Sequence, residues 1–132
     1  MKVNRLSGYI LDSSAVLAVI LEEKGAEFIK DILDRSFMST VNFSEVLTKL
    51  LKLGVPVDEA KKEILQTVNR IIPFNIDIAT LAGKMIMQTE RFGLSLGDRA
   101  CIATGEIMAY DIITADKIWG KLKLSVKIKV IR

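Results

Sequence analysis

Residues 9–15 are YILDSSA, and this stretch decides the fold. Its three large apolar residues are typical of a strand that is buried on both faces, and Asp12 follows them where a helix should begin. An acid at an expected helix start recurs at Glu45, Asp98 and Asp116. Strands buried on both faces belong to parallel sheets whose connections are helices. The pattern therefore predicts an α/β protein.

Outward from this stretch, apolar runs with strand character alternate with helical periodicity along the chain. We expect strands at residues 9–11, 37–41, 72–74, 110–114 and 126–131. We expect helices beginning after Asp12, over 24–34, from Asn42 to Gly54, over 58–72 and 77–91, and from Ser95 to Glu106. This order predicts a three-layer α/β/α sandwich with a mainly parallel five-stranded sheet, formed as a single domain of residues 1–132.

The size and the cysteine content narrow the class of protein. A chain of 132 residues is long enough to bury a core without disulfides or a structural metal. The single cysteine, Cys101, excludes an internal disulfide and a zinc cluster, so we expect a buried helix residue and a cytoplasmic protein. Residues 9–21 are apolar, but Asp12 interrupts them and the run is shorter than the ~20 residues of a membrane span. We expect no membrane contact.

The charge and the hydrophobic content suggest partners. The formal net charge of +3 is compatible with a polyanionic partner but is too small to establish one. Half of the residues are hydrophobic, and the expected helices 58–72 and 77–91 each carry an apolar face. Such surplus apolar surface is usually covered by another chain, and a twofold contact covers a repeated patch most simply. We therefore expect a homodimer, unless both helices are used entirely in the core.

The four acids form a candidate metal site. In an open parallel sheet the strand-to-helix turns lie on one edge, so acids that are distant in sequence can converge there. Convergent carboxylates repel one another, and a hard cation relieves that repulsion. Ligands that are all oxygen suit Mg²⁺ or Mn²⁺.

Each acid also has a structural alternative, because helix starts favour acids as caps. The expected caps are Asp12, Asp116 and two capping boxes, Asn42 with Glu45 and Ser95 with Asp98. Caps need no common location, whereas these four acids are all expected at the same edge of the sheet. The two roles are compatible, since a capping carboxylate keeps oxygen lone pairs for a metal.

Absent residues exclude several chemistries. The chain has no histidine, which excludes a histidine base, a Ser-His-Asp triad and a histidine-ligated zinc. It contains neither a P-loop motif nor a GxGxxG motif, which argues against a nucleotide site. A phosphoaspartate at Asp12 is disfavoured because Ser14 stands where a second acid would help.

Four motifs carry a resemblance to a known family. They are LDSSA at 11–15, SEV at 44–46, SLGDRA at 95–100 and TADK at 114–117. In these motifs the sequence resembles the PIN-domain nucleases, and most closely the VapC-type ribonuclease toxins of bacterial and archaeal toxin–antitoxin pairs. The resemblance covers nearly the whole chain, and the third motif followed closely by the fourth is its most specific part.

The resemblance implies a site and a chemistry. It places the catalytic, metal-binding acids at Asp12, Glu45, Asp98 and Asp116, with Ser14 and Thr114 as supporting polar groups. One or two Mg²⁺ or Mn²⁺ ions would lower the pKa of a water molecule for in-line attack on an RNA phosphate, leaving a 5′-phosphate. The family also implies a small antitoxin partner and a homodimer. We expect Asp98 and Asp116 to be the more exposed acids.

The surrounding residues leave alternatives open. An acidic pocket repels RNA, so flanking cations are expected to guide its backbone, with solvated surface charge as the alternative role. These cations are Arg99, Lys117, Lys121 and Lys123. We expect Trp119 in the core and Met85 and Met87 in the core or an interface. The competing functions are a housekeeping RNA-processing nuclease without an antitoxin and a non-catalytic binding or assembly module of the same fold.

Overall fold

The computed structural model describes residues 7–132; residues 1–6 of the expected domain lie outside the described part. A single sheet has the strand order β3-β2-β1-β4-β5, and every neighbouring pair is parallel. The strands are β1 (Tyr9–Leu11), β2 (Ser36–Ser39), β3 (Arg70–Ile72), β4 (Asp111–Thr114) and β5 (Ile128–Val130). The expected five-stranded sheet is confirmed.

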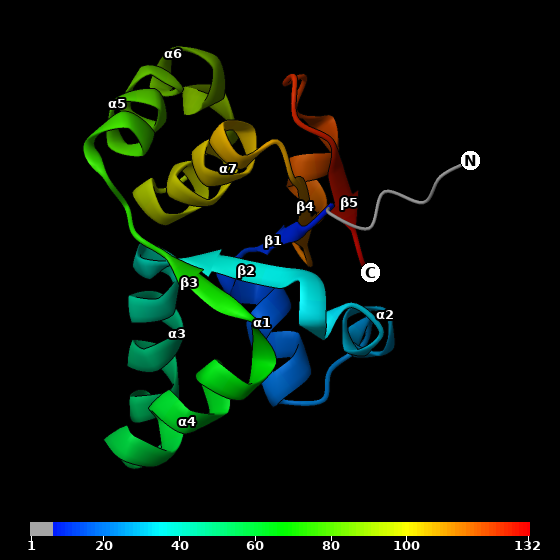
Figure 1. Ribbon diagram of the computed structural model, residues 1–132. Coiled ribbons are helices and arrows are strands. Elements are labelled where there is room, and N and C mark those ends of the chain that lie inside the picture. The colour runs from blue at the N-terminus through cyan, green and yellow to red at the C-terminus, as the bar shows by residue number, and fades with distance from the viewer. Residues whose placement is uncertain (1–6) are drawn as a thin grey trace.

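Helices cover both faces of this sheet. The α-helices are α1 (Ser13–Ile20), α2 (Ala26–Lys30), α3 (Thr40–Lys52), α4 (Val57–Thr67), α5 (Ile76–Lys84), α6 (Ile86–Thr89) and α7 (Leu96–Met108). The 3-10 helices are η1 (Leu33–Arg35), η2 (Glu90–Phe92) and η3 (Lys117–Lys121). Figure 1 shows α1 to α4 on one side of the sheet and α5 to α7 on the other, which is the expected three-layer sandwich. No helix in residues 7–132 is long and apolar enough to cross a membrane.

The core has two parts, one on each face of the sheet. Leu11 packs with the buried residues of α1, α3 and α4. Its neighbour Ile10 packs with those of α5 and α7, together with Trp119 and Cys101. Successive residues of a strand point to opposite faces, so both must be apolar when helices cover both. This explains the uninterrupted run in residues 9–11 and confirms the buried positions of Trp119 and Cys101.

Two expected helices are divided. The segment 24–34 forms α2 and η1 instead of one helix, and it begins at Gly25, whose φ is +99°. The segment 77–91 forms α5, α6 and η2, and it ends as expected at Gly93. Met85 is buried as expected, whereas Met87 is 87% exposed and does not belong to the core. Apolar periodicity predicted the buried face in both cases but not the breaks in the backbone.

The expected boundaries around β2 and β3 are also displaced. Strand β2 ends at Ser39, whose Oγ accepts a hydrogen bond from Val41 N at 3.1 Å and caps α3. The expected capping box of Asn42 with Glu45 is therefore wrong, because both residues lie inside the helix. Strand β3 ends at Ile72 rather than crossing Pro73, and α4 ends at Thr67.

Candidate active site

The strand order places a topological switch point at the carboxyl edge of the sheet, between β1 and β4. The chain connects outward from β1 through β2 to β3 and then returns to β4 on the opposite side of β1. Asp12 directly follows β1, and its N–H donates to Ile113 O of β4 at 3.1 Å. Asp116 lies two residues beyond β4. Ligand sites of open α/β sheets form at such switch points.

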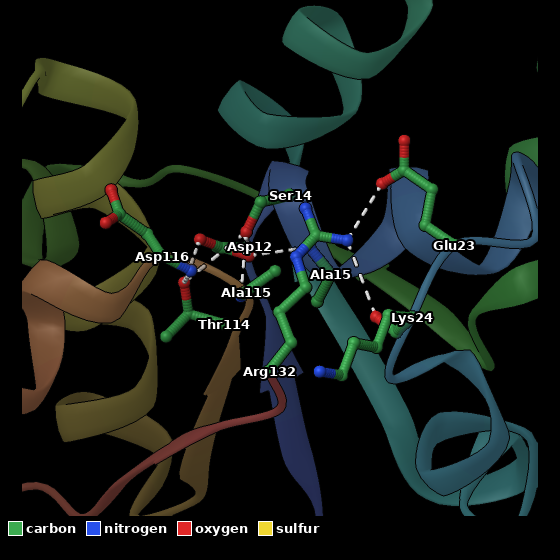
Figure 2. A network of polar contacts seen from close by, with 9 residues as sticks. All are labelled: Asp12, Ser14, Ala15, Glu23, Lys24, Thr114, Ala115, Asp116 and Arg132. Atoms are coloured by element: carbon green, nitrogen blue, oxygen red, sulfur yellow. Dashed lines mark hydrogen bonds and ion pairs between the residues drawn. The ribbon is translucent and has the colours of Figure 1, made fainter.

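Asp12 is the most buried acid at this switch point and is only 4% exposed. Its carboxylate accepts hydrogen bonds from Ala15 N at 2.8 Å, Ser14 Oγ at 2.7 Å and Thr114 Oγ1 at 2.6 Å. Figure 2 shows these donors around the carboxylate. Burial raises the pKa of Asp12 from its ordinary 3.8 to about 6, although the three hydrogen bonds act to lower it. Asp12 thus caps α1 and retains a raised proton affinity.

The two expected supporting hydroxyls connect β4 to α1. Ser14 Oγ accepts from Ala115 N at 2.9 Å, and Thr114 Oγ1 accepts from Asp116 N at 3.0 Å. Asp116 itself caps η3, because Ile118 N donates to its Oδ1 at 3.0 Å. These bonds fix the backbone that carries Asp116 relative to Asp12.

Glu45 is held by Ser13, which the sequence did not single out, and by Asn42, which the sequence paired with Glu45 only as a cap. Ser13 Oγ donates to Glu45 Oε1 at 2.5 Å, and Asn42 Nδ2 donates to the same oxygen at 3.0 Å. Asn42 Nδ2 also donates to Ser13 Oγ at 3.1 Å and to Gly97 O at 3.2 Å. Asn42 is 1% exposed, and its Oδ1 has no hydrogen-bond partner among the described residues. Asn42 therefore joins the helices that carry Glu45 and Asp98.

Gly97 makes the close approach of α3 and α7 possible. A β-carbon at this position would lie 2.1 Å from Glu45 Oε2 and 2.5 Å from Glu45 Oε1. The glycine in the first turn of a helix, directly before an acid, was a visible signal for this contact. Only the structure shows that the neighbour is a second carboxylate.

Asp98 connects the acids electrostatically. The expected capping box is confirmed: Ser95 N donates to Asp98 Oδ2 at 2.9 Å, and Asp98 N donates to Ser95 Oγ at 3.1 Å. Burial raises the pKa of Asp98, and the negative charges of Glu45 and Asp116 raise it further. The charge of Asp98 in turn contributes to the raised pKa of Asp12. Asp98 is therefore close enough to each of the other three acids for their charges to interact.

The four acids differ in exposure. Asp12 is buried and Asp98 is partly buried, whereas Glu45 and Asp116 are exposed. The expectation of an exposed Asp116 is confirmed, but Glu45 takes the second exposed position instead of Asp98.

The donor set fits a hard divalent cation. The four acids offer only carboxylate oxygen, and burial, assisted by repulsion between neighbouring acids, raises the pKa values of Asp12 and Asp98, which a bound cation would lower again. In the side-chain positions of residues 7–132, no three acidic or cysteine side chains already enclose a metal position.

The four expected backbone-contacting cations lie in different places. Arg99 is partly buried, and its guanidinium donates to Ala82 O of α5 at 2.8 Å, so it ties α7 to α5. Lys117 is exposed next to Asp116. Lys121 and Lys123 line a cavity of about 440 Å³ together with Arg91 of η2. The structure brings two of the four together and adds a third that the sequence did not indicate.

The comparisons with known proteins cover the residues that form this candidate site. The PIN domain profile matches residues 9–123. The fold is similar to a chain of a toxin–antitoxin complex from Klebsiella pneumoniae, with 17% identity, a TM-score of 0.74 and coverage of 95% of this chain and 98% of that chain. It is also similar to a chain of VapBC2 from Rickettsia felis bound to a promoter DNA fragment, with 13% identity, a TM-score of 0.73 and coverage of 94% and 98%. No curated protein sequence matches.

Proposed function

The chain belongs to the PIN-domain family, and from this premise we propose that it is a metal-dependent endoribonuclease acting as the toxin of a toxin–antitoxin pair. PIN domains are generally nucleases, so the family supports hydrolysis of nucleic acids. The observation that carries the finer proposal is that Asp12, Glu45 and Asp116 each interact electrostatically with Asp98 at the carboxyl edge of the sheet.

Each acid has a distinct part in the proposed mechanism. A bound Mg²⁺ or Mn²⁺ would supply the positive charge that favours deprotonation of the attacking water and stabilises the leaving oxygen. Ser14 and Thr114 fix Asp12 in one orientation, so its carboxylate would offer the cation a ligand in a fixed position. Glu45 is oriented through Oε1 by Ser13 and Asn42, which directs its other oxygen toward the first turn of α7. The exposed Asp116 lies nearest to an arriving phosphodiester, and the partly buried Asp98 completes the acid cluster.

The proposed substrate is RNA, and the proposed product carries a 5′-phosphate. The proposed partners are a small antitoxin and a second copy of the chain. Support comes from the family motifs, from the fold shared with chains of toxin–antitoxin complexes, and from exposed apolar residues on the helices. These include Leu53 at 58%, Ile76 at 78% and Met87 at 87% exposure. An amphipathic partner helix would cover such residues.

Cleavage of labelled RNA by the purified protein over a series of Mg²⁺ concentrations tests the activity. We expect Asp98→Asn to remove most cleavage while the fold is kept, because the amide retains an oxygen for the Ser95 N–H. Asp58→Asn, the same change at an exposed acid of α4, is the matched control and should cleave as the wild type does. If Asp98→Asn and Asp116→Asn both retain wild-type cleavage at limiting Mg²⁺, the site assignment is wrong.

Expression in cells tests the biological role. The wild type should arrest growth when expressed alone, and Asp98→Asn should not. Co-expression of a small protein encoded beside this one should restore growth and block cleavage by the purified complex. Wild-type expression without a growth defect, in cells where the RNase activity is measured and present, would favour the housekeeping nuclease.

A further inference from the structure

A groove lies between the α5–α6–η2 arm and the segment 121–125. It consists of two cavities of about 440 Å³ and 460 Å³ that share Gln88 and Lys123. In Figure 1 the arm and this segment lie at the same end of the molecule, on either side of α7. We call this feature the α6 groove. Because the cavities share walls, it is long enough for an extended ligand rather than a single small ion.

Cations from three separate segments face the α6 groove. Lys84 comes from α5, Arg91 from η2, and Lys121 and Lys123 from the end of η3 and beyond. All four are exposed, and within residues 7–132 none of them forms an ion pair. The lining also contains Glu90 and Glu106, and Glu106 accepts a hydrogen bond from Ser125 Oγ at 2.6 Å. The net charge of the lining is positive, which suits a polyanion.

Apolar side chains lie among these cations. Met87 is 87% exposed, which is unusual for a large apolar residue, and Phe92 is partly exposed beside it in the lining. The Arg91 guanidinium lies 5.0 Å from the centre of the Phe92 ring. Cations that track a backbone, together with apolar and aromatic faces that receive bases, are the combination that binds single-stranded nucleic acid.

The α6 groove is connected to the acid cluster through η3. This 3-10 helix begins after Asp116, which caps it, and ends at Lys121. At ~2.0 Å per residue, the five residues of η3 span about 10 Å. At the ~3.4 Å step of a strand in a stacked duplex, that length corresponds to about three nucleotides, and an extended single strand needs fewer. A strand positioned at Asp116 would therefore reach the groove within a few nucleotides.

We propose that the α6 groove is a second contact region for the substrate, which binds single-stranded RNA that continues from the acid cluster along η3. This inference rests on the proposed nuclease function and adds the form of the substrate and the direction in which it leaves the site. The backbone contacts Lys121, Lys123 and Arg91, and unpaired bases lie against Phe92 and Met87.

Fluorescence anisotropy tests the groove separately from cleavage. The probe is a fluorescein-labelled oligouridylate, bound to the full chain in EDTA so that no hydrolysis occurs. Each lost phosphate contact lowers the slope of log K against the logarithm of the salt concentration by about 0.7. At 0.1 M salt the loss of two contacts therefore lowers log K by about 1.4, so we expect the Lys121→Gln/Lys123→Gln double variant to bind about 25-fold more weakly. Its salt slope should be shallower by about 1.4. Lys61→Gln/Lys62→Gln on α4 makes the same charge change away from the groove and should bind as the wild type does.

A second variant tests the apolar contacts. Phe92→Leu keeps an apolar side chain but removes the stacking face, and it should weaken binding of the oligouridylate without changing the salt slope. A duplex RNA of equal length should bind the wild type more weakly than the single strand does.

The outcomes separate the two proposals. Equal losses of affinity in the groove variants and in the α4 control would overturn the groove assignment while leaving the nuclease function in place. Wild-type protein that binds RNA through the groove but cuts no RNA with Mg²⁺ would overturn the function and keep the groove. Normal RNA binding by the groove variants, with loss of binding to a purified acidic antitoxin segment, would assign the groove to a protein partner instead.

Discussion

The contact between Gly97 and Glu45 gives the sharpest test of the candidate site. In Gly97→Ala the new β-carbon would stand 2.1 Å from Glu45 Oε2, whereas ordinary contact begins at 3.4 Å. The carboxylate must therefore move by about 1.3 Å, since the helix backbone that carries Gly97 is held by the capping box of Ser95 and Asp98. This displacement breaks the geometry of the hydrogen bonds from Ser13 and Asn42.

The expected effects on stability and on activity differ strongly. Alanine in place of glycine in a helix gains about 1 kcal/mol, and the weakened hydrogen bonds of the exposed Glu45 lose about 1–2 kcal/mol. The free energy of unfolding should therefore change by only about 1 kcal/mol. A displacement of about 1 Å in a catalytic group costs on the order of 10²-fold in rate. We expect a folded protein with about one hundredth of the wild-type cleavage rate.

Two measurements and one control separate these effects. Urea unfolding gives the stability, and isothermal titration with Mn²⁺ alongside RNA cleavage gives the function of the site. Gly83→Ala in α5 is the matched control, because nothing lies within 4 Å of a β-carbon there. It should be slightly more stable than the wild type and fully active.

A compensating substitution of Glu45 provides a second test of this contact. Glu45→Asp shortens the side chain by one methylene and should recover part of the activity in the Gly97→Ala background, although it is harmful in the wild type. Wild-type cleavage and Mn²⁺ affinity in Gly97→Ala would refute the role given to this contact. So would an equal loss of cleavage in Gly83→Ala.

Two further predictions concern the carboxyl group of Asp12, and a third concerns assembly. The pKa of Asp12 is about 6 in the folded protein against an ordinary 3.8, so its carboxyl binds a proton more tightly when folded. The metal-free protein should therefore gain up to about 3 kcal/mol from Asp12 as the pH falls from 7 through 6 toward 3.8, and Asp12→Asn should lack this gain in urea unfolding. Thr114→Val removes the donor to Asp12 Oδ2, which should raise the pKa of Asp12 and move the acidic limb of the pH–rate profile upward by about one unit. Sedimentation equilibrium at micromolar concentration should show a twofold dimer; a lone 14.7 kDa species would count decisively against it.

The sheet and the positions of the acids could be predicted because local and global signals agree there. The run in residues 9–11 is apolar on both faces, and the structure covers both faces with helices. Asp12, Asp98 and Asp116 all cap helices, and the start of a helix on the carboxyl edge of a parallel sheet is also where ligand sites form. The capping alternative and the site proposal therefore describe the same three residues.

The rest depended on contacts between distant segments. Both Ser39 and Asn42 are good caps for α3, and sequence periodicity cannot choose between them. Asn42 lies inside the helix and bonds to Gly97 O, a partner 55 positions away that no local pattern reveals. In the same way, Arg99 resembles a surface cation in sequence, yet it donates to a backbone carbonyl of α5.

The way in which Asp12 is buried argues that the acid cluster is more than a set of caps. A buried structural carboxylate is usually neutralised by an arginine or a lysine. Here the side chains that donate to Asp12 are two uncharged hydroxyls, and they do not offset the cost of burial, so the pKa remains raised. Within residues 7–132 the single ion pair joins Arg132 to Glu23 beyond the end of α1, as Figure 2 shows. The acid cluster is thus left with negative charge that the described residues do not balance, which is the condition that an external divalent cation would relieve.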